Sequence, residues 1–130
     1  MITDLLETFN GFINLSGCNE PGWKYNSLYG YFLENGREYT PAIYSKKKYG
    51  RKEAYKQCFI NAWRLALKHE ELRYVEGYAA PNGMELPFNH AFCVTQEGEV
   101  VDPTWDFPEK GRYLGIELDI TLVSQVFVKW

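Results

Sequence analysis

Residues 57–62, with the sequence QCFINA, decide the fold of this chain because they place a cysteine at the start of a helix. The surrounding residues 54–67 contain no glycine or proline. They put Cys58, Ala62, Leu65 and Ala66 at spacings of three and four positions, which predicts one buried helical stripe. Cys58 then lies near the N-terminal end, where free backbone N–H groups and the helix dipole favour a thiolate over a thiol.

A basic segment precedes the predicted helix. Residues 46–56 carry six positive charges and one negative charge, a net of +5, whereas residues 57–130 carry six positive and eleven negative charges, a net of −5. The segment adds to the stabilisation of a thiolate at Cys58. Because a nucleic-acid-binding domain usually shows a larger basic face, we interpret the segment as a solvated loop and predict no nucleic-acid partner.

Length and composition predict one domain spanning residues 1–130. The chain is 45% hydrophobic and 17% aromatic with a formal net charge of −3, which supplies enough material for one core. Its three cysteines, at positions 18, 58 and 93, cannot all pair, and this fits a reducing compartment. We find neither a leader-like segment nor a run long enough to span a membrane, and therefore expect a soluble, cytoplasmic protein.

An amphipathic helix is predicted at the N-terminus. Its apolar stripe comprises Ile2, Leu5, Leu6, Phe9, Phe12 and Ile13, at helical spacing. Asn35-Gly36 fits either the end of a helix or a two-residue hairpin, and we favour the helix. Residues 37–50 are predicted to be irregular.

After the helix at Cys58 the pattern changes to that of strands. Residues 72–79 and 90–95 are predicted strands, and Gln96-Glu97-Gly98-Glu99 closes a hairpin onto residues 100–102. Residues 113–116 fit a further strand, whereas 121–128 fit either a strand or a helix. The sequence therefore predicts an α+β fold in which the Cys58 helix packs on an antiparallel sheet.

Three reactive side chains follow one another in the order Cys58, His90, Asp102. The predicted hairpin would place His90 and Asp102 on neighbouring strands near the same end of the sheet. Asp102 could then accept a hydrogen bond from one imidazole nitrogen and leave the other nitrogen to face the thiol. We interpret the three residues as a catalytic triad.

A metal site made of Cys58, His90, Cys93 and Asp102 is the competing interpretation. It is weak because the chain has no CxxC pair, and because His90 and Cys93, three positions apart on a strand, face opposite sides. We therefore predict no metal and no cofactor, and assign Cys93 to the core.

The reactive residues stand within a larger ordered set of segments. Cys58 with Asn61-Ala62 is followed by YVEGY at 74–78, HAF at 90–92 and VVDPTW at 100–105. Over roughly residues 50–110 this set resembles the transglutaminase-like branch of the papain-like cysteine enzymes, here as a small stand-alone core. The family often has tryptophan where Phe92 stands, a conservative difference.

The resemblance implies that Cys58 attacks an amide or ester carbonyl and forms a thioester, whose acyl group passes to an amine or to water. It implies that His90 is the general base and acid and that Asp102 orients it. The Cys58 N–H and a side-chain donor would stabilise the oxyanion, and Gln57 is our candidate for that donor. Tyr78 and Trp105 are candidates for the substrate groove, although packing in the core is the commoner role for such residues.

Two functions fit these observations. The first is a cysteine-dependent enzyme that acts on a peptide or protein amide as a peptidase, a deamidase or an acyltransferase to an amine. The alternative is a binding or regulatory module that keeps the papain-like core without turnover and engages a partner protein. Retention of all three reactive residue types favours the enzyme.

Overall fold

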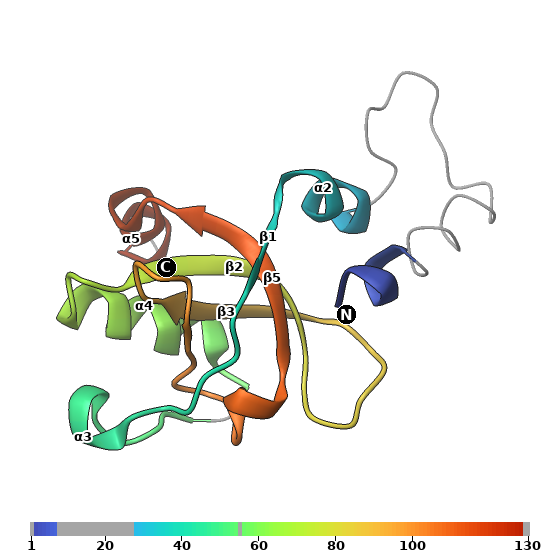
Figure 1. The fold of residues 1–130 in the computed structure, drawn as a ribbon. Coiled ribbons are helices and arrows are strands. Elements are labelled where there is room, and N and C mark those ends of the chain that lie inside the picture. The colour runs from blue at the N-terminus through green and yellow to red at the C-terminus, as the bar shows by residue number, and fades with distance from the viewer. Residues whose placement is uncertain (1, 8–27, 55, 129–130) are drawn as a thin grey trace.

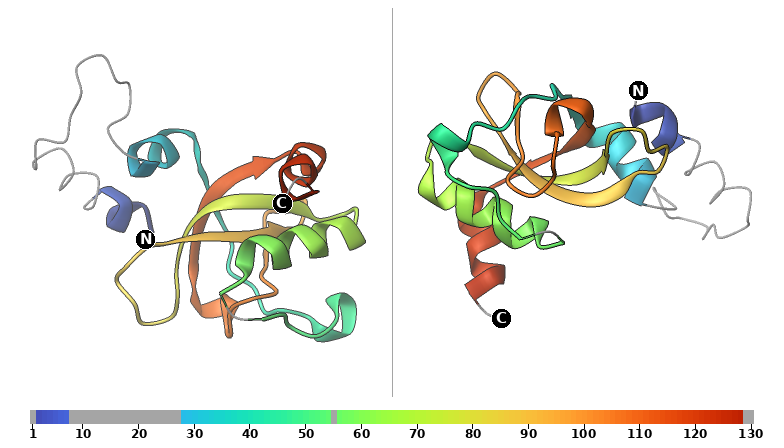
Figure 2. Two further views of the ribbon diagram at one scale, coloured as in Figure 1. Left: turned by 180° about the vertical axis from the view of Figure 1, so that it is seen from behind. Right: turned by 90° about the horizontal axis from the view of Figure 1, so that it is seen from below.

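The computed structural model describes residues 2–7, 28–54 and 56–128 of the chain (Figures 1 and 2). These residues form an α+β fold with a five-stranded antiparallel sheet in the order β1-β5-β2-β3-β4. The strands are β1 (Arg37–Tyr39), β2 (Arg73–Ala80), β3 (Phe88–Val94), β4 (Val100–Val101) and β5 (Arg112–Leu118). The helices are α2 (Leu28–Asn35), α3 (Lys46–Tyr49), α4 (Cys58–Lys68), the short 3-10 helix η1 (Pro108–Lys110) and α5 (Ile120–Val128).

The sheet curls until its two outer strands meet. Thr40, directly after β1, donates its N–H to the Gly98 carbonyl at 2.9 Å and accepts the Val100 N–H at 2.8 Å. One inner cluster of buried side chains draws on every strand, with Tyr39, Val75, Phe92, Val100 and Tyr113 as members. The curled sheet therefore encloses an aromatic and aliphatic interior.

Two facing glycines allow β2 and β5 to approach closely. Gly77 and Gly115 are register partners, and a Cβ atom added to Gly77 would lie 2.1 Å from the Leu114 carbonyl oxygen. No other residue type could occupy Gly77 without moving the backbone of β5.

The Cys-bearing helix α4 packs on the outer face of the sheet, as the sequence predicts. Its buried stripe of Ala62, Leu65 and Ala66 contacts Tyr74 of β2 and Cys93 of β3 in a second cluster. Figure 2 shows α4 alongside β2 and β3. The buried positions of α4 are three and four residues apart, and this spacing explains why the helix was predictable.

The hairpin between β3 and β4 is confirmed, and so is the predicted helix ending at Asn35. Gly98 N–H donates to the Thr95 carbonyl at 3.0 Å, and Gly98 has a φ of 84°, which glycine adopts without strain. The ambiguous segment 121–128 lies within helix α5. Trp63 Nε1 donates to Ser124 Oγ at 2.9 Å and fastens this helix to α4.

The prediction that residues 37–50 are irregular is wrong. They contain β1 and the four-residue helix α3. The strand has only three residues and pairs with β5, more than 70 positions later. A strand this short shows no alternation that a sequence pattern could reveal.

The N-terminal prediction is covered only in part by the described residues. Residues 2–7 are helical, and Ile2 and Leu6 are buried in a third cluster with Tyr78 and Leu114. The other half of the predicted stripe, and Cys18, lie outside the described residues. Within the described ranges, no helix has both the length and the apolar character needed to cross a membrane.

Candidate active site

Cys58 is the first residue of α4, and its side chain is partly exposed. Gln57 occupies the N-cap position and makes no side-chain capping hydrogen bond. Lys56 has a φ of 69°, a left-handed conformation uncommon outside glycine that turns the chain just before the helix. The thiol therefore lies at the positive end of the helix dipole.

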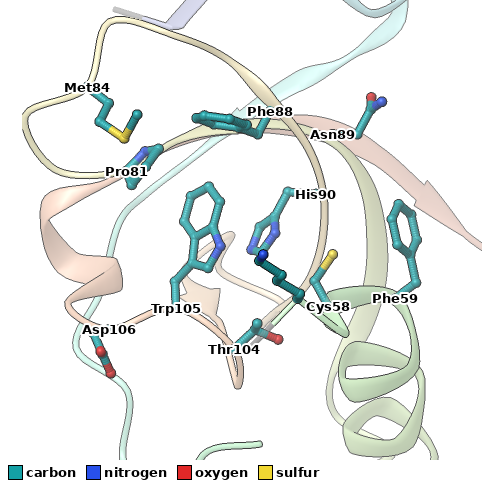
Figure 3. A pocket seen from close by; sticks show the side chains of 11 residues that line it. Cys58, Phe59, Pro81, Met84, Phe88, Asn89, His90, Thr104, Trp105 and Asp106 are labelled. Carbon is teal, nitrogen blue, oxygen red and sulfur yellow. The ribbon is translucent and has the colours of Figure 1, made fainter. Parts of the chain in front are cut away.

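His90 lies between Cys58 and Asp102. In the register of β3 with β4, Cys93 pairs with Val101. Asp102 is the next residue after Val101 and therefore lies close to β3. His90 Nε2 lies 2.8 Å from Asp102 Oδ2, and the two side chains are only 1% and 0% exposed. Cys58 acts on this imidazole through a hydrogen bond and its charge, and Figure 3 shows the two side chains next to each other. Because Asp102 takes Nε2, Nδ1 is the nitrogen that remains for the thiol.

Asp102 is surrounded by hydrogen-bond donors. Its Oδ1 accepts the backbone N–H groups of Thr104 at 2.9 Å and Trp105 at 3.2 Å. Its Oδ2 accepts the Tyr113 hydroxyl at 2.8 Å, in addition to its contact with His90. Burial alone would raise the pKa of Asp102, but the hydrogen bond and charge of His90 together with the other donors lower it. The carboxylate is therefore ionised at neutral pH.

The same interactions hold His90 as an imidazolium. Burial favours the neutral ring, but the hydrogen bonds and charges of Asp102 and Cys58 outweigh it and raise the pKa of His90 to about 9. The Trp105 indole stacks on the imidazole with ring centroids 3.9 Å apart and planes 20° apart, which adds a cation–π attraction. Lys52 Nζ donates to the backbone carbonyl of Trp105 and so helps to hold the turn that carries the indole.

Asn61 connects the nucleophile helix to the turn that carries Asp102. This buried side chain donates from Nδ2 to Thr104 Oγ1 at 3.0 Å and to the Ala54 carbonyl at 2.8 Å. Glu53 N–H donates to the Pro103 carbonyl at 2.9 Å. These bonds fix the start of α4 relative to residues 102–105 and so set the position of Cys58 against His90.

Cys58 and His90 open onto a cavity of about 640 Å³ (Figure 3). Trp105 also lines it, and Met84 from the β2–β3 connection and Phe88 at the start of β3 add an apolar wall. Met84 is 40% exposed and Phe88 is 41% exposed. A substrate can therefore reach the thiol through a largely apolar entrance.

The structure brings together Cys58, His90, Asp102 and Trp105 but not the other two predicted site residues. Gln57 is exposed and is not among the residues that line the cavity. Tyr78 is 4% exposed and packs with Ile2 and Leu114, so it takes the core role that was the alternative. Its register partner on β3, Asn89, does line the cavity, so the site reaches this pair of positions from the β3 side only.

Tyr113 was missed because nothing local in the sequence couples β5 to Asp102. We expect Tyr113→Phe to lower the free energy of unfolding by about 1–2 kcal/mol, since a buried carboxylate loses a donor. The pKa of Asp102 should rise, so the variant should lose stability at a higher pH than the native protein as the solution is acidified. Urea unfolding between pH 3 and pH 7 measures both effects.

A matched control is Tyr39→Phe. Tyr39 belongs to the same inner cluster, but its hydroxyl donates to Glu117 Oε2 at 3.1 Å, a partly exposed carboxylate. If both variants lost the same free energy of unfolding and had the same pH dependence between pH 3 and pH 7, Tyr113 would contribute packing and would not hold Asp102.

No protein-family model, curated protein or solved structure matches this chain. What the site does is therefore inferred from its own residues and their geometry.

Proposed function

We propose that the chain is a cysteine-dependent enzyme that processes peptide or protein amides through a thioester on Cys58, by hydrolysis or by acyl transfer to an amine. One observation carries the proposal: the buried His90 imidazole contacts Cys58 on one side and lies 2.8 Å from Asp102 on the other. A nucleophile, a base and a group that orients the base are the parts that covalent acyl transfer needs.

In the first half of the proposed reaction, His90 already holds the proton as an imidazolium, and the Cys58 Sγ attacks the carbonyl carbon as a thiolate. A C–S bond forms and the carbonyl oxygen becomes an oxyanion, which the backbone N–H groups at the start of α4 can stabilise. The C–N bond then breaks as His90 Nδ1 returns a proton to the leaving nitrogen. The products are a free amine and a thioester on Cys58.

In the second half, water or an amine attacks the thioester carbonyl. His90 accepts a proton from the attacking group, the C–S bond breaks, and the electron pair returns to the sulfur. Asp102 stays ionised throughout, because its donors lower its pKa. Its role is to hold the imidazole and to stabilise its charged form.

We also propose that the fold is a transglutaminase-like core preceded by an N-terminal amphipathic helix. The packing of α4 on the curled sheet supports the first part, and the helical residues 2–7 with buried Ile2 and Leu6 support the second. Cys58 and Cys93 are both free thiols, which supports a reducing, cytoplasmic setting.

Acyl capture tests the proposed function. The protein is incubated with p-nitrophenyl acetate and with glutamine-containing peptides, quenched in acid, and analysed by intact mass and peptide mapping. We expect one acyl group per chain, on Cys58, that neutral hydroxylamine removes as it does other thioesters. Cys93 is an internal control, because it is fully buried, its Sγ donates to the Ala62 carbonyl at 3.2 Å, and burial raises its pKa.

Absence of acylation with every donor, or equal acylation of Cys93 and surface lysines, would contradict the proposal. The non-catalytic binding module would then be the better explanation.

A further inference from the structure

A second cleft, of about 450 Å³, adjoins the candidate active site. The residues that line it are Phe59, Glu76, Leu118, Asp119, Leu122, Val123 and Val126. Phe59 also lines the first cavity and directly follows Cys58 in the sequence. One aromatic side chain next to the nucleophile therefore forms a wall of both clefts.

Helix α5 and the end of β5 supply the apolar side of this second cleft, which we call the α5 cleft. Leu118, Leu122 and Val126 are 39%, 63% and 58% exposed, and their spacing of four places the two helical members one turn apart on one face. Val123 also lines the cleft, but it is buried in the cluster that includes Ala62 and Leu65 of α4. An exposed aliphatic stripe of this kind beside a reactive group suits a ligand with an apolar stem.

The polar groups of the α5 cleft are acidic. Glu76 Oε2 accepts the Tyr74 hydroxyl at 2.8 Å, and Asp119 Oδ1 accepts the Thr121 N–H at 2.8 Å. Both carboxylates are thereby held in place at the cleft. Among the described residues that line it, none is basic. This combination is complementary to an aliphatic chain that ends in a cation.

The proton transfer of the proposed reaction determines which part of a substrate faces the α5 cleft. His90 must reach the leaving nitrogen, so the amine portion of the substrate lies on the side of His90 and Trp105. Figure 3 shows Cys58 between His90 and Phe59. The acyl portion, on the opposite side of the carbonyl carbon, therefore extends toward Phe59 and the cleft beyond it.

We propose, on the basis of the proposed function, that the α5 cleft binds the acyl portion of the substrate and selects a long aliphatic side chain with a terminal positive charge, such as that of lysine. The acyl group that becomes attached to Cys58 would then carry this side chain. The bonds made and broken are those of the acylation step above, and no further reactant is needed.

Acylation rates with three activated esters test this selectivity. The p-nitrophenyl esters of N-acetyl-lysine, N-acetyl-norleucine and N-acetyl-glutamate have a common reacting group and differ at the end of the side chain. We expect second-order rate constants, from p-nitrophenolate release, in the order lysine, norleucine, glutamate. Glu76→Gln keeps an acceptor for Tyr74 and should lower the lysine-to-norleucine ratio by about tenfold, since it removes one charge at short range.

A second pair of variants separates the cleft from the general surface charge. Leu122→Lys adds a cation inside the α5 cleft and should reduce the preference for the lysine ester. Leu67→Lys is the matched control, because Leu67 is 50% exposed on α4 and lines neither cleft. It should leave the order of the three esters unchanged.

The outcomes distinguish this inference from the proposed function. Equal rates for the three esters, or a lysine preference that survives both Glu76→Gln and Leu122→Lys, would overturn the cleft assignment and leave the thioester chemistry intact. Absence of acylation with any ester would overturn the proposed function. In that case the cleft is tested by titrating N-acetyl-lysine amide and N-acetyl-norleucine amide into the protein and following the NMR signals of the Leu122 and Val126 methyl groups. Methyl shifts that do not change would overturn the cleft assignment as well.

Discussion

His90→Ala should slow the acylation of Cys58 by about three to four orders of magnitude, the usual effect of removing one member of a catalytic triad. The thiol would lose its proton acceptor, and the leaving nitrogen would lose its proton donor. Cys58→Ala should abolish acyl capture. Single-turnover release of p-nitrophenolate at pH 7 measures both rates, and circular dichroism checks that the variants are folded.

His69→Gln is the matched histidine control. His69 is the C-cap of α4, and its Nδ1 lies 3.5 Å from Glu71 Oε1 at the protein surface. Its replacement should leave the acylation rate within about a factor of two, as expected for a surface position away from the site. A His90→Ala protein that reacts as fast as the His69→Gln protein would exclude His90 as the base.

Asp102→Asn should have the second largest effect, because it keeps the shape of the side chain and removes its negative charge. The pKa of His90, which Asp102 raises, should fall, and the imidazole should lose its fixed orientation. We expect acylation at pH 7 to slow by about two to four orders of magnitude and the free energy of unfolding to fall by about 3 kcal/mol, since a buried ion pair loses one partner.

The pH dependence of stability gives the same substitution a second signature. The lowered pKa of Asp102 stabilises the native protein above the ordinary carboxyl value of 3.8, and this stabilisation is lost as the pH falls through the lowered pKa. The raised pKa of His90 stabilises it below the ordinary value of 6.5, and this is lost as the pH rises toward about 9. The contribution of the pair is therefore greatest between about pH 4 and pH 6.5.

Asp102→Asn should reduce both the loss of stability at acid pH (the acid limb) and the loss at alkaline pH (the alkaline limb). Urea unfolding from pH 3 to pH 10 measures them. Should that variant fail to fold, His90→Gln, which keeps an N–H group toward Asp102, tests the alkaline limb alone. An alkaline limb that persists in either variant would show that another group produces it.

Local patterns were sufficient to predict the Cys58 helix and the hairpin that follows it. The spacing of Ala62, Leu65 and Ala66 indicates a buried helix face, and Gly98 indicates the turn between β3 and β4. Since a hairpin fixes which residues lie side by side, the pairing of His90 with Asp102 was predictable as well.

The contacts that hold the site in place could not be predicted, because they join residues that are distant in the sequence. Tyr113 reaches Asp102 only because β5 returns to the curled sheet between β1 and β2. Asn61 reaches Thr104 across 43 positions. No periodicity encodes such contacts, since they depend on how the whole sheet closes.

The backbone bonds of Thr40 with Gly98 and Val100 also bear on how separate copies of the chain meet. An open sheet leaves a row of free amide and carbonyl groups along each border, and these recruit strands from other molecules. Here the two edges of the sheet form backbone hydrogen bonds with each other within one molecule, so fewer of these groups are left for another chain. We expect this arrangement to protect the native protein against fibril growth by strand addition.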